Sequence, residues 1–522
     1  GGTLNGVTLT AVAQTTVRAS DPYPAIGNLD NDGEAEVVVR QLFPVIDING
    51  NVVNHHHLCV YNATGTLLAF FDLDASADFT YLVSAANNNK TGTIGIYDFD
   101  GDGVAEISHG LGIFRYNPSG TGSSLELLGY PQTIEGRGIN NDYYGEQVVA
   151  VDVDDPSDAS YTYGLELIAG NTVYDVNTAA LPWIIGARTI ATRAADGVEY
   201  PDGYTSVVDW DGDELLDVVV SSSRGDSSFI YVWDPISREI LAESDPIGPN
   251  NDISRARVTD FDNDGALEIV VTTSRNFNIF ELDAGSTSLN GIPLLEISDN
   301  IGTTDRSGNT TCTAFDFNSD GAKEIVYRDE TTLRIFTYDG TTLTEEDSSP
   351  CFSGTIIEYP IVADVDNDGQ AEIVCACNTA NTNVNQAFIT VFESNGFPWA
   401  DARSVWNQHA YFYANINDDL SIPVNQQNHA LPHDGAALVH PGHINSFLHQ
   451  YTDTVFRLPN AVISGPTWDC EMNTITVEVC NEGDNILPIG MPITVYGEDP
   501  TVTSPAIIGS TTLGTSLNPD GS

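Results

Sequence analysis

The stretch Asp260-Phe-Asp262-Asn-Asp264-Gly265-Ala-Leu-Glu268, followed directly by the apolar run Ile269-Val-Val271, decides the fold. Its pattern is D-x-D-x-D-G-x-x-E and then a strand, and it recurs along the chain. The seven copies begin at residues 28, 98, 152, 209, 260, 316 and 364. The intervals between them run from 48 to 70 residues, which is the size of one four-stranded propeller blade with its loops.

A second apolar strand follows each copy further along the chain. Examples are Ile230-Tyr-Val-Trp233 and Ile279-Phe-Glu-Leu282, short β-branched and aromatic runs bounded by turn residues. Such runs are typical of strands and hairpins, and convincing helical periodicity is absent. We therefore predict an all-β fold, with residues 1–400 forming a seven-bladed β-propeller. Residues 1–15 or 385–406 should supply a strand that closes the ring, because proteins avoid exposed strand edges.

The repeated loop has the chemistry of a calcium site. Side chains at positions 1, 3 and 5 of a tight loop converge on one point, Gly at position 6 allows the turn, and an acid at position 9 completes the ligands. Oxygen ligands without His or Cys favour calcium over zinc or copper, and magnesium rarely uses all-protein cages. We predict about five to seven Ca²⁺ ions. The candidate ligands are Asn28, Asp30, Asp32, Glu36, Asp98, Asp100, Asp102, Glu106, Asp152, Asp154, Glu166, Asp209, Asp211, Asp213, Asp217, Asp260, Asp262, Asp264, Glu268, Asp316, Asn318, Asp320, Glu324, Asp364, Asp366, Asp368 and Glu372.

Two copies depart from the pattern. Glu214 stands at position 6 of the loop at 209, where Gly is expected, so this loop should bind calcium less reliably. The loop at 152 is interrupted by Pro156 and an insertion before Glu166. One such loop alone could be a solvated acidic turn, but seven at blade spacing leave that interpretation little room.

The motif, its order and the strand after it resemble the FG-GAP or VCBS repeats of integrin α-subunit propellers and of many bacterial surface proteins. The resemblance covers roughly residues 1–400. In that family the loop lies between two strands of a blade and binds calcium. The resemblance therefore implies the same position and the same ligand for the acids named above.

The repeat stops near Trp399. Within residues 401–457, the phrases Ser404-Val-Trp-Asn-Gln-His409 and Asn445-Ser-Phe-Leu-His-Gln450 resemble a segment that follows propellers in large exported proteins of Bacteroidetes-type bacteria. This stretch also carries His429, His433, His440 and His443. They form either a metal or catalytic cluster or polar residues of an extension that packs on the propeller, and we favour the second interpretation.

Residues 458–522 have a different pattern. Thr474-Ile-Thr-Val-Glu-Val-Cys480 alternates cleanly, a turn follows, and Ile493-Thr-Val-Tyr496 is another strand. This resembles the start of an Ig-like β-sandwich of a bacterial adhesin. The segment is shorter than the ~100 residues such a sandwich needs, so we interpret the chain as a piece of a longer protein.

The charge and the cysteine content of the chain limit the classes of partner that it can bind and the disulfides that it can form. The chain has 74 Asp and Glu against 18 Lys and Arg, a formal net charge of -56, which repels itself unless cations neutralise it. We expect no nucleic-acid partner, because phosphates need Lys and Arg, and no membrane insertion, because no apolar stretch is long enough. Seven cysteines are too few for a disulfide scaffold. Cys470 with Cys480 and Cys312 with Cys351 are the two candidate disulfides.

The leading functional hypothesis is a non-enzymatic, secreted, calcium-binding module of a cell-surface adhesin, stalk or filament. Its loops would contact a protein or glycan ligand or neighbouring subunits of a surface assembly. The alternative is a polysaccharide-active, lyase-like enzyme on a calcium-stabilised propeller. That enzyme would need Lys, Arg, Tyr or His near the axis, and the sequence reveals no such constellation. We assign the triple His55-His56-His57 to a loop tip near a strand start.

Overall fold

The structure is a computed structural model, and strands dominate it. It describes residues 4–9, 23–46, 49–75, 92–118, 124–140, 145–159, 161, 163–190, 200–224, 227–247, 253–273, 276–282, 288–296, 308–352, 359–377, 388–394, 398–431, 445–450, 461–469, 474–481, 490–496, 507–514 and 517. Within these residues the one helical segment is the 3₁₀ turn Tyr413–Asn415. The prediction of an all-β fold is confirmed.

Most strands belong to four-stranded antiparallel units in which sequence neighbours pair. The first three units are β2 (Ala25–Gly27), β3 (Glu36–Ile46), β4 (Val52–Tyr61) and β5 (Leu67–Asp72); β6 (Ile94–Tyr97), β7 (Glu106–His109), β8 (Gly112–Asn117) and β9 (Ser124–Gly129); and β10 (Val149–Val151), β11 (Glu166–Ala169), β12 (Thr172–Asn177) and β13 (Ile184–Thr189).

The next two units form one eight-stranded sheet, because β17 and β21 pair in parallel. They are β14 (Tyr204–Val208), β15 (Asp217–Arg224), β16 (Ser227–Trp233) and β17 (Ile240–Ser244), then β18 (Arg257–Thr259), β19 (Glu268–Thr273), β20 (Asn276–Leu282) and β21 (Ser288–Glu296). The sixth unit is β22 (Thr313–Phe315), β23 (Glu324–Arg328), β24 (Thr332–Tyr338) and β25 (Leu343–Pro350).

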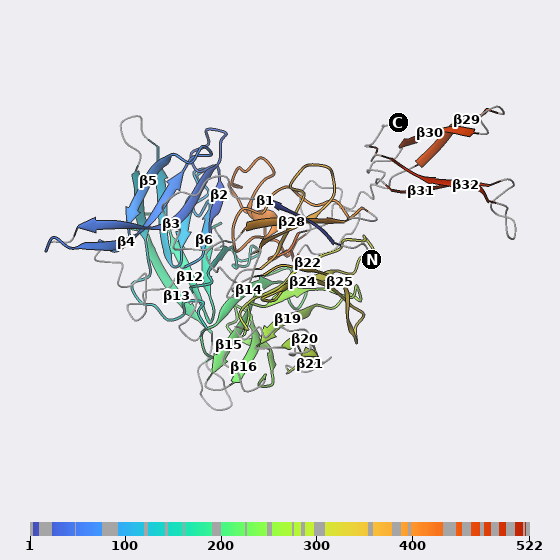
Figure 1. Cartoon of the computed structure of the whole chain (residues 1–522). Helices are drawn as coiled ribbons and strands as arrows, with labels where there is room; N and C mark the ends of the chain where they lie inside the picture. The colour runs from blue at the N-terminus through green and yellow to red at the C-terminus, as the bar shows by residue number, and fades with distance from the viewer. Residues whose placement is uncertain are drawn as a thin grey trace.

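The seventh unit combines the two ends of the repeat region. It contains β26 (Ile361–Ala363), β27 (Glu372–Cys377), β28 (Phe388–Ser394) and, as its fourth strand, β1 (Leu4–Leu9). β1 pairs antiparallel with β28 from Leu4 opposite Ser394 to Leu9 opposite Ile389, and Figure 1 shows the two strands side by side. The chain thus places its first described strand in its last four-stranded unit.

Every acidic loop occupies the same place in its unit. It joins the first strand to the second, and the residue before the loop pairs with the last acid of the loop, which is at position 9 in six loops and at position 15 in the loop at 152. The pairs are Gly27 with Glu36, Tyr97 with Glu106, Val151 with Glu166, Val208 with Asp217, Thr259 with Glu268, Phe315 with Glu324 and Ala363 with Glu372. The shared register fixes seven equivalent loops at one side of the strands.

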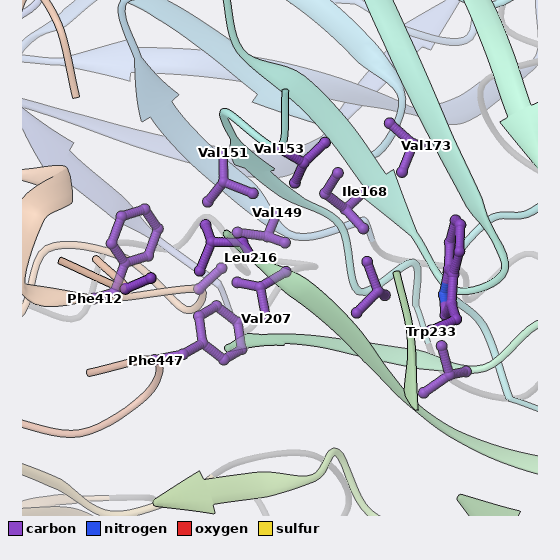
Figure 2. Close-up of a cluster of buried hydrophobic side chains, with 14 of the residues drawn as sticks. Val149, Val151, Val153, Ile168, Val173, Val207, Leu216, Trp233, Phe412 and Phe447 are labelled. Carbon is purple, nitrogen blue, oxygen red and sulfur yellow. The ribbon is translucent and has the colours of Figure 1, made fainter. Parts of the chain in front are cut away.

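Apolar side chains between neighbouring units form the core. One cluster joins Val149 and Val151 of the third unit, Val207 of the fourth, and Phe412 and Phe447 from the segment after the repeats. Figure 2 shows these side chains directed into one cluster. Strands buried on both faces explain the continuous apolar runs that follow the acidic loops.

The segment that follows the repeats, residues 398–450 and here called the extension, contacts six of the units. Its hydrogen bonds join Ile26 N–H to Asn407 O (2.8 Å), Ile96 N–H to Gln408 Oε1 (2.8 Å), Gln426 Nε2 to Ala150 O (3.4 Å), Asp209 N–H to Asn445 Oδ1 (3.0 Å), Thr313 Oγ1 to Leu448 O (3.1 Å) and Asp364 N–H to Arg403 O (3.2 Å). All six unit partners lie in a first strand or at the start of its acidic loop. The extension therefore links first strands across the units.

The remaining strands form two antiparallel pairs. They are β29 (Ala461–Asp469) with β30 (Thr474–Asn481), and β31 (Pro492–Tyr496) with β32 (Ile507–Thr512). In Figure 1 these pairs lie apart from the other sheets. The Ig-like sandwich remains a prediction.

Both disulfide predictions are wrong at the cysteines that the structure describes. Cys351 bonds to Cys377, with Cα atoms 4.9 Å apart, while Cys312 and Cys480 carry free thiols. Cys351 and Cys377 share the apolar cluster between the last two units, whereas Cys312 belongs to the neighbouring cluster. Cys470 lies outside the described residues.

The three consecutive histidines lie within β4 and not at a loop tip. Their neighbours are acids of the following hairpin, with His55 Nδ1 2.9 Å from Asp72 Oδ2 and His56 Nδ1 3.1 Å from Asp74 Oδ2.

Across the described residues, no helix is long and apolar enough to span a bilayer.

Candidate metal centres

Six of the seven acidic loops, all but the loop at 152, make two left-handed bends, at positions 4 and 6. At position 6, Gly33 and Gly265 have φ of 91° and 93°. At position 4, Asn31 and Asn263 have φ of 59° and 63°. The sequence analysis identified the Gly at position 6 but missed position 4. The signal was present, because position 4 holds Asn, Gly or Ser in six loops and these residues adopt this conformation at low cost.

Glu214 adopts the conformation that Gly has in the other loops. Its φ is 71°, and its N–H donates to Asp209 Oδ2 at 3.1 Å. Gly265 makes the equivalent bond to Asp260 Oδ2 at 3.0 Å. The loop at 209 therefore forms despite its departure from the pattern, with the backbone strain that a side chain adds at positive φ.

The last acid of each loop, at position 9 in six loops and Glu166 in the loop at 152, is fixed in the same way in all seven loops. It is buried, and one of its carboxylate oxygens accepts the backbone N–H of position 2 at 2.7 to 3.2 Å. This bond directs the carboxyl group into the loop and leaves its second oxygen for another partner. For Glu36, Glu268 and Glu372, no side chain or N–H among the described residues takes that oxygen.

The environment of the last acid of each loop disfavours its charged form. Burial, reinforced by the neighbouring aspartates, raises the pKa of Glu36 to about 7 and that of Glu268 to about 8. The same causes raise the pKa of Asp217 and Glu372 to about 8. A bound divalent cation would relieve the repulsion between these carboxylates, because it supplies positive charge to several of them at once.

Five loops bring their acids into a group whose ligand atoms all lie within 4.8 Å of one another. The groups are Asp30, Asp32 and Glu36; Asp98, Asp100 and Glu106; Asp209, Asp211 and Asp217; Asp260, Asp262, Asp264 and Glu268; and Asp364, Asp366 and Glu372. Two buried oxygens at position 1, Asn28 Oδ1 and Asp364 Oδ1, have no hydrogen-bond partner among the described residues. Such orphaned oxygens within an all-oxygen donor set fit a calcium ion.

The loop at 152 has an internal cation instead. Arg188 on β13 places Nη2 2.9 Å from Asp154 Oδ1 and Nε 2.6 Å from Asp175 Oδ1. The Tyr161 hydroxyl donates to Asp152 Oδ2 at 2.6 Å. Asp152, Asp154 and Glu166 are not gathered into a metal-sized group. In this loop the Arg188 guanidinium supplies positive charge to Asp154 and Asp175, as a metal ion would do in the other loops.

In two further loops, other side chains of the protein occupy part of the ligand set. In the loop at 98, Arg115 pairs with Glu106, and its Nη2 lies 3.2 Å from Asp100 Oδ2 and 3.3 Å from Asp102 Oδ2. In the loop at 316, Asn318 Nδ2 donates to Glu324 Oε1 at 3.0 Å. This hydrogen bond takes the oxygen that a metal ion would need. Asp316, Asp320 and Glu324 do not form a metal-sized group. The loops at 28, 209, 260 and 364 thus have the most open ligand sets.

The histidines of the extension divide into two groups. His429 and His449 are fully buried, and burial lowers the pKa of His429 to about 3. His433, His440 and His443 lie outside the described residues. The structure also brings Arg255, Arg257, Tyr359 and His409 into one cluster of contacts. The sequence analysis missed this group because its members come from distant parts of the chain.

Comparison with known proteins identifies the repeats. A family model described as an FG-GAP-like repeat matches residues 209–271 and 316–375. Each match runs from one acidic loop through the next loop to the following strand. FG-GAP-like repeats are therefore confirmed in these two stretches. A search of the curated proteins found no match.

Solved structures offer distant similarities. The V. cholerae biofilm matrix protein Bap1 has a TM-score of 0.49 and 15% identity, over 82% of this chain and 84% of that one. The exotype rhamnogalacturonan lyase YesX has a TM-score of 0.44 and 14% identity, over 84% of this chain and 68% of that one. With TM-scores below 0.5, neither similarity carries an argument about this chain.

Proposed function

We propose that the seven units close into a seven-bladed β-propeller that serves as a non-enzymatic, extracellular, calcium-binding module of a cell-surface adhesin, stalk or filament. The observation that carries the proposal is the identical register of the seven acidic loops, each between the first and second strand of its unit. A rigid disc stabilised by calcium would present its variable loops to a protein or glycan ligand or to neighbouring subunits.

Closure of the ring is supported at both ends of the repeat region. β1 pairs with β28, and the extension bonds to Asp364 of the seventh unit through Arg403 and to Ile26 of the first through Asn407. A short stretch of one segment therefore touches the last and the first unit. This is the arrangement that a closed ring requires.

Calcium occupancy should differ among the loops. The loops at 28, 209, 260 and 364 have open ligand sets and are proposed to bind most tightly. Arg115 competes at the loop at 98, while Arg188 and Asn318 weaken or replace the metal in the loops at 152 and 316. Magnesium is disfavoured, because it retains several waters and rarely uses all-protein cages.

Two features support an extracellular, non-enzymatic role. The Cys351–Cys377 disulfide is typical of oxidising compartments outside the cytosol. The arginines nearest to a possible acid–base site, Arg255 and Arg257, are buried, where a polysaccharide does not reach them. Tyr359 and His409 contact each other, with ring centroids 5.0 Å apart.

Native mass spectrometry combined with a glycan assay tests the proposal. The protein, freed of calcium and then titrated, should bind at least four Ca²⁺ ions, and glycan arrays should report binding without cleavage. Calcium-dependent release of unsaturated sugar products from an acidic polysaccharide would overturn the non-enzymatic role and favour the lyase-like alternative. Fewer than four bound ions would overturn the assignment of the open loops.

A further inference from the structure

Two arginines of the fifth unit are buried beneath the extension. Arg257 begins β18 and Arg255 precedes it by two residues, with exposed fractions of 0% and 2%. The like charge of Arg257 contributes to lowering the pKa of Arg255, which burial brings down to about 10. Contacts join the two groups in one cluster, because Arg255 contacts His409, the His409 ring contacts Tyr359, and Arg257 lies over the Tyr359 ring.

Each guanidinium is held by neutral groups and keeps one nitrogen unused. Arg255 donates through Nε to Thr205 O and through Nη1 to Gln147 Oε1 at 3.2 Å. Arg257 donates through Nε and Nη2 to Cys312 O. Arg255 Nη2 and Arg257 Nη1 are buried and have no hydrogen-bond partner among the described residues.

The surroundings contain no compensating charge in the described part of the chain. The other contacts of the pair are rings: the Arg255 guanidinium lies 4.8 Å from the Phe447 ring centroid, and that of Arg257 lies 5.2 Å from the Tyr359 centroid. His409 Nδ1 is 3.4 Å from Arg255 Nη1. By contrast, the buried Arg334 pairs with Asp329 at 3.1 Å and Glu345 at 2.8 Å.

This arrangement is unfavourable without a negative partner. A buried charge without a counter-ion has an effective penalty of several kcal/mol, and each unused donor adds to it. The chain has 74 acidic residues and only 18 basic ones. From this composition, a carboxylate partner is expected for each buried arginine. The described residues place none here. A bound anion would supply the missing negative charge.

We propose that Arg255 and Arg257 bind a small inorganic anion, of the size of chloride, through their unused Nη atoms. A small ion is the ligand expected here, because both guanidinium groups are buried and the rings of Phe447 and Tyr359 lie against them. The anion would neutralise the pair and tie the extension to the first strand of the fifth unit. It is independent of the calcium loops and of the proposed surface role.

The test measures the melting temperature while the anion is varied and calcium is constant. The protein is dialysed into gluconate salts with calcium gluconate, and sodium chloride or bromide then replaces sodium gluconate at fixed ionic strength. We expect a saturable rise in the melting temperature. A crystal grown in bromide should show an anomalous peak between Arg255 Nη2 and Arg257 Nη1.

Two variants separate the site from general salt effects. Arg257→Met should abolish the response to chloride, and Arg334→Met, which breaks a pair with carboxylates, should lower the melting temperature and leave that response intact. If Arg257→Met fails to fold, the bromide crystal of the unmodified protein decides alone. An ordered water, or a carboxylate of the chain, at the two Nη atoms would overturn the proposal, as would an unchanged chloride response in Arg257→Met.

Discussion

Removing calcium should lower the free energy of unfolding by a large part of its total. Each open loop contributes RT ln(1 + [Ca²⁺]/Kd) to the free energy of unfolding. With a Kd of ~10⁻⁴ to 10⁻³ M, usual for extracellular modules, about 5 mM calcium gives roughly 1 to 2 kcal/mol per loop. The loops at 28, 209, 260 and 364 together then supply about 4 to 8 kcal/mol, against a typical total of about 5 to 15 kcal/mol.

Calorimetry in 5 mM calcium and in excess chelator, at about pH 8, measures this loss as a fall in melting temperature. Single variants locate it. Asp262→Ala should lose about 1 to 2 kcal/mol in calcium and little in chelator, because its loop depends on the ion. Asp154→Ala is the matched control, because its partner is Arg188 at 2.9 Å. It should be destabilised equally in both buffers.

A melting temperature that chelator leaves unchanged would refute a stabilising role for calcium. An identical response of Asp262→Ala and Asp154→Ala to calcium would refute it too, since Asp262 belongs to an open ligand set and Asp154 has an internal cation. If chelator lowers the melting temperature of Asp262→Ala as much as that of the unmodified protein, the stabilising ion is bound at another loop.

Three further predictions follow from the loop geometry. Without calcium, stability should fall as pH rises from about 4.5 to 8, because burial holds the folded pKa of Glu268 at about 8, above its unfolded value; melting temperatures in chelator across this range measure it, and calcium should flatten the curve. Glu214→Gly should stabilise the protein by about 1 kcal/mol, because position 6 has positive φ; a destabilised variant would contradict this. Arg115→Gln should tighten calcium binding at the loop at 98 by removing a competing cation, measured by calorimetric titration; a weaker affinity would contradict it.

Local features of the fold could be predicted from the sequence. The acidic loop and the apolar strand after it lie within about a dozen residues, so their spacing reports both the turn and the ligand positions. The loop at 260 shows this well, because Thr259 pairs with Glu268 and every acid between them is named by the pattern.

Features that depend on distant contacts could not be predicted. Arg188 reaches Asp154 from another strand, and no motif relates an arginine on β13 to a loop before β11. The Cys351–Cys377 bond follows from the docking of one unit on the next. Spacing within the sequence carries no information about such neighbours, so the loop at 152 was predicted as a metal site on its acids alone.

The pairing of β1 with β28 has a consequence for the order of folding. Units one to six are made of strands adjacent in sequence, so each can form as soon as it is synthesised. The seventh needs Leu4 and its neighbours to wait for Ser394, and loop closure over that distance is slow compared with local hairpins. During synthesis, β1 therefore remains without its partner strand until β28 has been made, and an unpaired strand edge favours aggregation in that interval.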